Sequence, residues 1–155
     1  QESFRNLQRN IKLNNLDNVI AENYGILKNT GTAELFVNKN TSMLSSMFTS
    51  DSSSKKETVS VISLQEIIEK HQIKKVDLLK LDCEGAEYEI LCNLPAKYFK
   101  EIDKIVMECH FVDKKPKLIG ELKQILVKQG FQVRTKTISN ELVLLYAIKD
   151  SIILC

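Results

Sequence analysis

The sequence lacks the features that mark membrane-spanning, secreted and nucleic-acid-binding proteins. Its longest apolar run, residues 142–148, is far shorter than the roughly 20 residues that cross a bilayer, and no charged-then-apolar signal pattern opens the chain. The four cysteines form no CxxC pair, and the 22 basic residues are scattered among 20 acidic ones. We therefore expect a cytosolic protein with buried free thiols, no membrane span and no nucleic-acid partner.

The composition that is present is typical of one soluble globular domain. The chain has 155 residues, of which 43% are hydrophobic and 27% charged. A chain of this length buries roughly 70% of its unfolded surface around a single core. We expect residues 1–155 to form one domain. Because the first residue is Gln1 rather than Met, we also expect that a segment has been removed upstream.

The first half of the chain predicts a helix, two short strands and a long loop. Phe4, Leu7 and Ile11 form an apolar stripe that predicts a helix over residues 2–14. Alternating apolar positions predict strands over residues 19–26 and 32–37. Residues 38–56 are rich in Ser, Thr, Asn and Lys and predict a long polar loop, either a lid that docks or a surface loop without a role.

The second half alternates strands with helices. Ser63 and Glu66 form a capping box that predicts a helix to about residue 71, and Pro116 and Gly130 bound a second, longer helix. The predicted strands are residues 58–62, 76–81, 105–109, 131–137 and 142–148, with a short helix that stops at Pro95. Residues 76–81 are almost continuously apolar, as in a strand buried on both faces. The order predicts a doubly wound α/β domain with a mainly parallel sheet and a C-terminal antiparallel hairpin.

Polar residues gather where two of these strands end. Asp82 and Glu84 follow residues 76–81, while Glu108 and His110 close residues 105–109. Ligands of open parallel sheets bind at the carboxyl ends of the strands, so these side chains are candidates for chemistry. Gly85 comes directly after Glu84. It allows a tight turn out of the strand and lets a ligand approach the backbone closely.

Structural and metal-binding roles are also open to these residues. Lys80 lies on the same strand face as Asp82, so the two side chains could form a structural ion pair instead of a catalytic site. Glu84 could simply stabilise the N-terminus of the helix that follows. Asp82, Glu108 and His110 could instead hold a divalent metal, although no spacing rule selects a metal and we prefer a site without one.

The run from Val76 to Glu87, with its Lys-x-Asp-x-Glu-Gly-Ala-Glu core, closely resembles the central motif of FkbM-type S-adenosylmethionine-dependent methyltransferases. The segments around Phe4 to Asn18, around Gly31 to Leu35 and around Ile105 to His110 are also similar to that family. The resemblance covers nearly all of residues 1–148. It implies a Rossmann-like class I methyltransferase sheet.

The resemblance also implies an activity and roles for residues. It implies methyl transfer from S-adenosylmethionine to a hydroxyl oxygen of a small molecule, sugar or lipid-like acceptor. Asp82 or His110 could act as the base, with Glu108 orienting the imidazole. The expected catalytic residues are Asp82, Glu84, Glu108 and His110, and the expected cofactor-binding residues are Tyr24, Gly25, Asp82 and Gly85.

This sequence departs from the family in one respect. The five glycines contain no G-x-G, so the glycine-rich cofactor loop of the family is not recognisable. Gln1 aligns just past the family's second strand, so the resemblance implies that the first two strands of the sheet are missing from residues 1–155. We expect residues 1–155 alone to bind the cofactor weakly or not at all, and to self-associate through the exposed edge of the strand at residues 76–81. The alternative function is a non-catalytic binding or interaction module derived from a methyltransferase.

Overall fold

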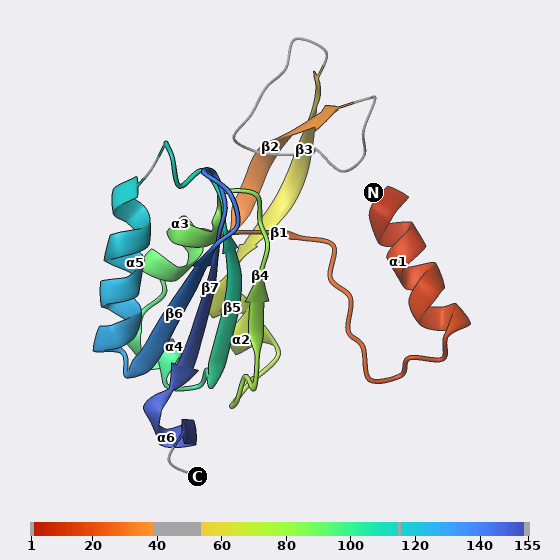
Figure 1. Cartoon of the computed structure of the whole chain (residues 1–155). Coiled ribbons are helices and arrows are strands. Elements are labelled where there is room, and N and C mark those ends of the chain that lie inside the picture. Colours follow the sequence, from red (N-terminus) through yellow and green to blue (C-terminus); the bar gives the residue numbers. More distant parts are fainter. Residues whose placement is uncertain (1, 39–53, 115, 154–155) are drawn as a thin grey trace.

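The computed structural model describes residues 2–38, 54–114 and 116–153, which form a mixed α/β structure with two small sheets (Figure 1). The elements in chain order are α1 (Glu2–Leu13), β1 (Gly25–Leu27), β2 (Gly31–Asn38), β3 (Ser54–Ser63), α2 (Leu64–Lys70), β4 (Leu79–Leu81), α3 (Glu87–Cys92), α4 (Ala96–Phe99), β5 (Lys104–Cys109), α5 (Pro116–Lys128), β6 (Phe131–Thr137), β7 (Val143–Lys149) and α6 (Asp150–Ile153). Within this part of the chain, no helix combines the length and apolarity that a membrane crossing requires.

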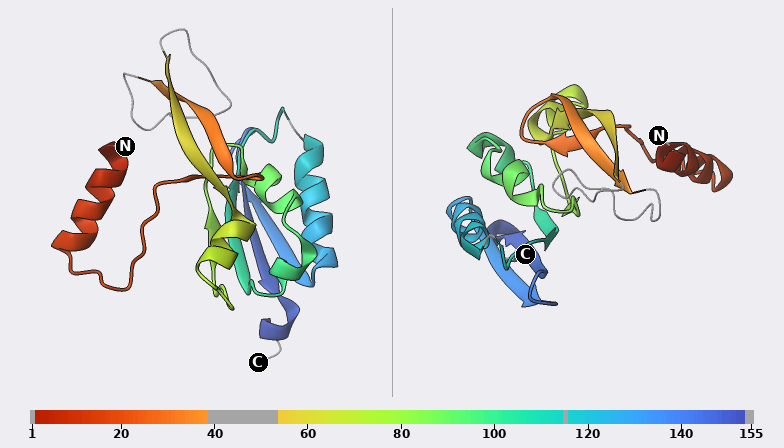
Figure 2. Two further views of the ribbon diagram at one scale, coloured as in Figure 1. Left: turned by 180° about the vertical axis from the view of Figure 1, so that it is seen from behind. Right: turned by 90° about the horizontal axis from the view of Figure 1, so that it is seen from above.

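The larger sheet carries the core and has the strand order β4-β5-β7-β6. Ile105, Met107 and Cys109 alternate along β5 and are fully buried, as the two-residue period of a strand requires. Leu122 and Leu126 lie one turn apart on α5 and are also fully buried in the same cluster. The helices α3 and α5 lie on the same face of this sheet (Figures 1 and 2).

The smaller sheet has the order β1-β3-β2, and among its side chains whose burial is described few are buried. The short β1 pairs in parallel with the end of β3, from Gly25 opposite Val61 to Leu27 opposite Ser63. The strand β2 pairs with β3 along its whole length in the antiparallel direction. Val61 and Ile62 are buried, and Ile26 and Leu27 pack against the main core.

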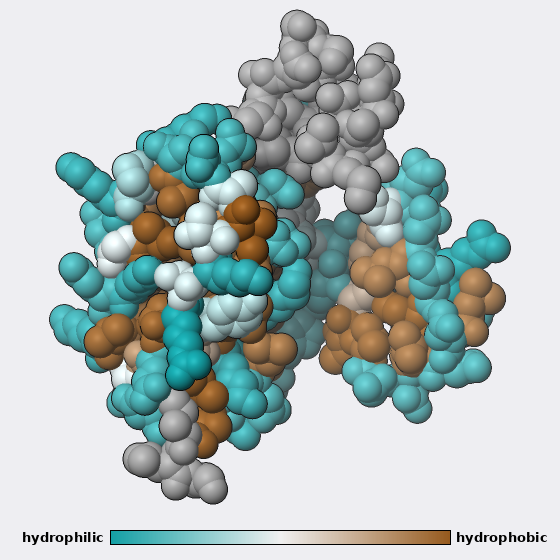
Figure 3. Space-filling view, in the orientation of Figure 1, coloured by the Kyte–Doolittle hydropathy of each residue, from teal (hydrophilic) through white to brown (hydrophobic). Residues whose placement is uncertain are grey.

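Helix α1 forms as the sequence predicts but stands off from the rest of the structure. None of its residues is buried. Figures 1 and 2 show it joined to β1 by an extended segment. Leu7 and Leu13 are 47% and 66% exposed, and Figure 3 shows apolar surface on the side of the helix that faces the body.

Several local predictions are confirmed. The Ser63 side chain accepts a hydrogen bond from the backbone N–H of Glu66 and caps α2. Helix α5 begins at Pro116, and Gly130 follows its end with a φ of 80°. The C-terminal hairpin forms, with β6 over the predicted residues and β7 within one residue of them. Cys83, Cys92 and Cys109 are free thiols, although only Cys109 is fully buried.

Two predicted strands are shorter than the sequence indicates. Of the predicted strand over residues 19–26, only Gly25 and Ile26 belong to a strand, β1, and Ile20 is 77% exposed. Similarly, β4 covers only Leu79–Leu81, with an isolated bridge from Val76 to Ile102. The prediction that residues 76–81 are buried on both faces is wrong, because Leu78 is 56% exposed and the Lys80 side chain, on the same strand face, is 59% exposed.

The sheet prediction also needs correction. A single mainly parallel sheet is expected from the alternation of strands and helices, but the described residues form two mixed sheets. The pairs β1–β3 and β4–β5 are parallel, whereas β2–β3, β5–β7 and β6–β7 are antiparallel. The loop expected over residues 38–56 is strand at both ends, since β2 reaches Asn38 and β3 starts at Ser54. Residues 39–53, where the lid is predicted, lie outside the described part.

Candidate functional site

The carboxyl ends of β4 and β5 lie side by side. The two strands are parallel, with Leu81 opposite Met107, so the next step of the register sets Asp82 beside Glu108. Immediately after Asp82 the chain turns sharply. Glu84 has a φ of 52° and Gly85 a φ of 107°. A positive φ is unfavourable for glutamate, and such conformations persist where the surrounding structure enforces them.

Glu87, at the start of α3, holds this turn in place. Its carboxylate accepts hydrogen bonds from the backbone N–H of Cys83, at 2.8 Å to Oε1, and of Gly85, at 2.9 Å to Oε2. The side chain is fully buried. A buried carboxylate is costly unless it is hydrogen-bonded, so these contacts both offset the desolvation of Glu87 and fix the backbone after β4.

The same carboxylate orients His110. Glu87 Oε1 lies 2.9 Å from Nδ1 of the imidazole, which is 15% exposed. The other ring nitrogen, Nε2, lies 3.7 Å from Glu84 Oε2 and 3.9 Å from Glu108 Oε2. The sequence suggests that Glu108 orients the imidazole, but Glu87 makes this contact. Glu84 and Glu108 lie near the opposite ring nitrogen, Nε2.

Tyr88 supports His110 through the backbone. Its hydroxyl donates a hydrogen bond of 3.2 Å to the carbonyl oxygen of His110. Burial raises the pKa of the Tyr88 phenol, so the hydroxyl stays protonated and keeps donating at neutral pH. Together, Glu87 and Tyr88 fix both the ring and the backbone of His110.

Sequence reasoning did not single out Glu87 as a functional residue. A signal for it is present, because Glu87 shares the i, i+3, i+4, i+7 face of α3 and its extension with Ile90, Leu91 and Leu94, all of which are buried. A carboxylate on the apolar face of a helix must find polar partners inside the protein. The position of Glu87 on that face could therefore have revealed it.

Lys80 and Asp82 form the ion pair that the sequence leaves open. Lys80 Nζ lies 3.0 Å from Asp82 Oδ2, and this hydrogen bond raises the pKa of the lysine, which stays charged. Both side chains are exposed enough to exchange partners, at 59% and 39%. Such surface pairs contribute little to stability, so the pair leaves Asp82 free to act on a ligand.

We call Asp82, Glu84, Glu108 and His110 the strand-tip cluster. The structure brings all four of these sequence-predicted residues together. Ligand atoms of Asp82, Glu108 and His110 all lie within 4.8 Å of one another. This arrangement can take up a proton or hold a cation.

The thiols next to the cluster are poor nucleophiles. Burial raises the pKa of Cys83 and raises the pKa of Cys109 to about 12. Because the thiolate rather than the thiol is reactive, both side chains remain in the unreactive form at neutral pH. The chemistry that this end of the sheet supports therefore depends on carboxylates and imidazole.

The residues expected to bind the cofactor do not all join the cluster. The ring of Tyr24 lies under Lys70 of α2, with Nζ 5.1 Å from its centroid, and Gly25 pairs with Val61 of β3. Gly85 lies in the turn after β4, but its N–H already donates to Glu87. Of the four expected residues, Asp82 and Gly85 are at the strand ends, while Tyr24 and Gly25 lie against β3 and α2.

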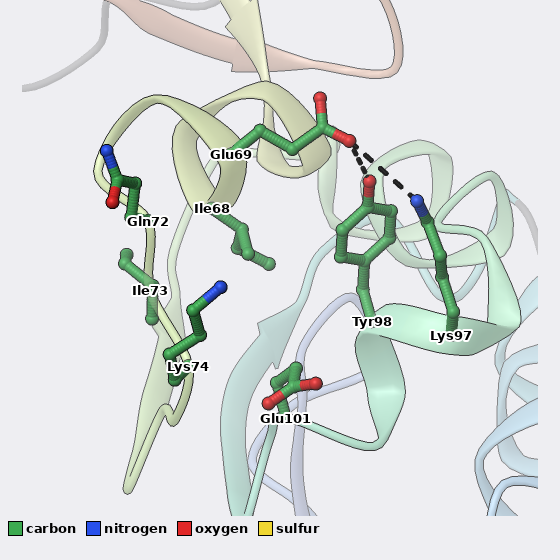
Figure 4. Close-up of a pocket in the computed structure, with 8 residues that line it drawn as sticks. All are labelled: Ile68, Glu69, Gln72, Ile73, Lys74, Lys97, Tyr98 and Glu101. Atoms are coloured by element: carbon green, nitrogen blue, oxygen red, sulfur yellow. Dashed lines mark hydrogen bonds and ion pairs between the residues drawn. The ribbon is translucent and has the colours of Figure 1, made fainter.

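A cavity of about 330 Å³ lies elsewhere, between α2 and α4 (Figure 4). Its lining includes residues that precede β4 and β5, such as Lys74 and Glu101. Glu69 accepts a hydrogen bond from the Tyr98 hydroxyl and lies 3.8 Å from Lys97 Nζ. No member of the strand-tip cluster lines this cavity. Because parallel strands bind ligands at their carboxyl ends, the strand-tip cluster is the better candidate site.

Comparison with known protein families decides the assignment. The family model described as "Methyltransferase FkbM domain" matches residues 1–133. The chain belongs to the FkbM methyltransferase family. The match includes α1, both parallel strand pairs and all four residues of the strand-tip cluster. No curated protein and no solved structure matches the chain.

Membership in the FkbM family implies methyl transfer, with S-adenosylmethionine as the methyl donor. It confirms the resemblance carried by the Lys80 to Glu87 motif. In this FkbM domain the motif forms the end of β4, the turn and the first residue of α3. The motif residue Glu87 is the one that joins the turn to His110 on the neighbouring strand.

Proposed function

We propose that this protein catalyses S-adenosylmethionine-dependent methyl transfer to a hydroxyl oxygen of a small molecule, sugar or lipid-like acceptor. The observation that carries the proposal is the strand-tip cluster, a set of proton acceptors at the carboxyl ends of β4 and β5 in an FkbM-family chain. The parallel pair β4–β5, whose carboxyl ends carry the cluster, and the C-terminal antiparallel hairpin also support the proposal.

The reaction is an in-line displacement. The acceptor oxygen forms a bond to the methyl carbon as the carbon–sulfur bond breaks, and the electron pair of that bond stays on sulfur, which becomes a neutral thioether. The hydroxyl proton passes to a base of the protein. Positioning of oxygen, carbon and sulfur in line supplies much of the acceleration, and general-base catalysis adds typically about 10²- to 10⁴-fold.

The strand-tip cluster offers the base. His110 is held at Nδ1 by Glu87, so Nε2 is the ring nitrogen directed toward Glu84 and Glu108. On the β4 side, the candidate bases are Glu84, whose side chain is 50% exposed, and Asp82, whose side chain is 39% exposed. The negative charge of the carboxylates also favours the positive sulfonium of the donor. We assign base chemistry to this cluster and cofactor contacts to Tyr24, Gly25, Asp82 and Gly85.

The proposal is tested by turnover and stability measured together. The assay supplies S-adenosylmethionine with a deuterated methyl group and hydroxylated sugars, lipids and small molecules, and detects labelled product by mass spectrometry. Asp82→Asn should lower turnover by roughly 10²-fold or more while the unfolding midpoint stays near that of the wild type. The matched control is Asp77→Asn, since Asp77 also pairs with a lysine two residues earlier, at 2.8 Å from Lys75. The control should leave turnover unchanged.

Two outcomes would contradict the proposal. Equal loss of turnover and stability in Asp82→Asn would favour a purely structural Lys80–Asp82 pair. Absence of labelled product from every acceptor would favour the second candidate, a non-catalytic binding module. Because the sequence predicts weak cofactor binding by residues 1–155 alone, calorimetry with S-adenosylmethionine accompanies the assay, on this chain and on a chain extended upstream.

We further propose that the chain self-associates through the edge of β4. Among the described residues β4 has one strand neighbour, β5, and Leu78 beside it is 56% exposed. An open edge of this kind pairs with other chains. Light scattering should show a mass that rises with concentration, and Leu78→Lys should suppress the rise while Val127→Lys, on the exposed side of α5, should not. A monomer at all concentrations would contradict this.

The cytosolic location expected from the sequence is also part of the proposal. Three free thiols suit a reducing compartment, where disulfides are rare.

A further inference from the structure

The strand-tip cluster contains a mixed set of metal-ligating atoms. Among the described residues, Asp82, Glu108 and His110 form a group of three whose ligand atoms all lie within 4.8 Å of one another. Atoms that bind one cation at about 2.1 Å lie roughly 3 Å apart. The side chains of Asp82 and Glu108 are 39% and 32% exposed, so small rotations about their side-chain bonds can close the difference.

His110 is oriented as metal-binding histidines are. Such histidines usually donate the second ring N–H to a carboxylate, which fixes the tautomer and directs the other nitrogen at the metal. Here the fully buried Glu87 contacts Nδ1 at 2.9 Å. The other ring nitrogen, Nε2, points toward the carboxylates of Glu84, at 3.7 Å, and Glu108, at 3.9 Å. The orienting carboxylate of Glu87 is not one of the three ligands and comes from a different element, α3.

The charge around His110 favours a cation. Four carboxylates, those of Asp82, Glu84, Glu87 and Glu108, lie close to the imidazole or to one another. Lys80 faces this group through Asp82 Oδ2, at 3.0 Å. Within residues 2–38, 54–114 and 116–153, Lys80 is the one lysine with an ion pair to this group. One ammonium group does not balance four carboxylates, so the cluster attracts further positive charge.

We propose that Asp82, Glu108 and His110 bind one divalent cation. Two carboxylate oxygens and one imidazole nitrogen suit first-row ions such as Mn²⁺ and Zn²⁺ better than an all-oxygen ion such as Ca²⁺. The role in catalysis rests on the proposed methyl transfer. There the cation would polarise the acceptor hydroxyl and ease loss of its proton. Glu84 lies outside the three ligands and would take that proton.

The experiment uses Mn²⁺ as the probe and needs no turnover. The electron paramagnetic resonance signal of free Mn²⁺ is lost when the ion binds, so a titration gives stoichiometry and affinity. We expect one site in the wild-type chain. Asp82→Asn should weaken binding at least about tenfold, since a charged ligand is lost. Glu87→Gln should weaken it by about 10- to 100-fold through the orientation of His110.

Two further variants give results that a merely structural role would not produce. Lys80→Met should strengthen Mn²⁺ binding about threefold to tenfold, because a competing positive charge is removed. The matched control is the Lys75–Asp77 pair, which has the same spacing and a 2.8 Å contact but lies outside the three-ligand group. Asp77→Asn should leave the affinity unchanged. Circular dichroism checks that each variant is folded.

The proposal is overturned if wild type binds no Mn²⁺ in the millimolar range or if Asp77→Asn weakens binding as much as Asp82→Asn. It is also overturned if Lys80→Met weakens binding. Because Asp82 is exposed, its variant remains informative even if Glu87→Gln fails to fold. Failure of metal binding leaves methyl transfer by a protein base intact, and failure of methyl transfer leaves the binding result intact, so the two proposals are tested separately.

Discussion

The described chain divides into two regions that are stabilised in different ways. The N-terminal region is residues 2–38 and 54–63, and the C-terminal region is residues 64–114 and 116–153. Of the described side chains, the N-terminal region buries only Val61 and Ile62, whereas all buried members of the main core cluster come from Ile68 onward. Both regions contain an amphipathic helix, α1 and α5, but only α5 buries its apolar stripe.

The difference shows that the candidate site depends on the C-terminal region. The strand-tip cluster and Glu87 all lie there, on elements that pack on one another. The N-terminal region is joined to it where β3 continues directly into α2, by packing of Ile26 and Leu27 against the core, and by ion pairs such as Lys28–Glu89 at 2.7 Å. The family match includes both regions, so the N-terminal region is part of the domain even though it contributes little to this core.

The largest expected effect compares one leucine from each helix. Leu126 of α5 is fully buried and Leu7 of α1 is 47% exposed. Leu126→Ala should lower the free energy of unfolding by about 2–5 kcal/mol, because it removes buried methyl groups and leaves a cavity. Leu7→Ala should change it by less than about 0.5 kcal/mol. Urea denaturation measures both. If both variants lost the same free energy of unfolding, the contrast between α5 and α1 would be wrong, and α1 would have to pack against a partner in solution.

An intermediate effect is expected from two glutamates on α3. Glu87→Gln should lower the free energy of unfolding by about 1–3 kcal/mol, because the buried contacts to Cys83, Gly85 and His110 are weakened. Glu89→Gln removes only the partly exposed pair with Lys28, so it should cost less than about 1 kcal/mol. Hydrogen exchange provides a second readout. The amides of Cys83 and Gly85 should lose protection in Glu87→Gln and keep it in Glu89→Gln.

The smallest effect is expected from the ion pairs that hold the segment before β1 to α2. Glu22 Oε1 lies 2.8 Å from Lys70 Nζ and 2.8 Å from His71 Nε2, and the hydrogen bond from Lys70, followed by that from His71, lowers the pKa of Glu22. A lowered folded-state pKa gives stability that is present above the ordinary glutamate pKa and is lost as the pH falls through the folded-state value. Glu22→Gln should therefore lower the urea midpoint slightly at pH 7.

As the pH falls toward 2, the difference in urea midpoint between wild type and Glu22→Gln should shrink, because Glu22 takes up a proton in the folded state as well. The control Asp17→Asn, in the same segment, should leave the urea midpoint at pH 7 unchanged. A difference between wild type and Glu22→Gln that is the same at pH 7 and pH 2 would show that this segment is not held by charge.

Local chemistry made much of the secondary structure predictable. The apolar stripe of α1, the capping box at Ser63 and the boundaries of α5 depend on neighbours within a few residues, so their sequence signals are direct. The terminal hairpin is similarly local. The ends of β1 and β4 were not predictable in this way, because a strand extends only as far as another strand pairs with it.

The family and the residues of the strand-tip cluster were determined by the sequence, because the Lys80 to Glu87 motif and the polar ends of two strands are visible in it. The partner of His110 was decided by tertiary structure. Glu87 and His110 are 23 residues apart, and their contact requires the parallel register of β4 and β5 together with burial of α3. Tertiary structure also decided that α1 stands off while α5 packs. Amphipathicity makes a helix able to bury one face, but only the surrounding chain supplies the surface that covers it.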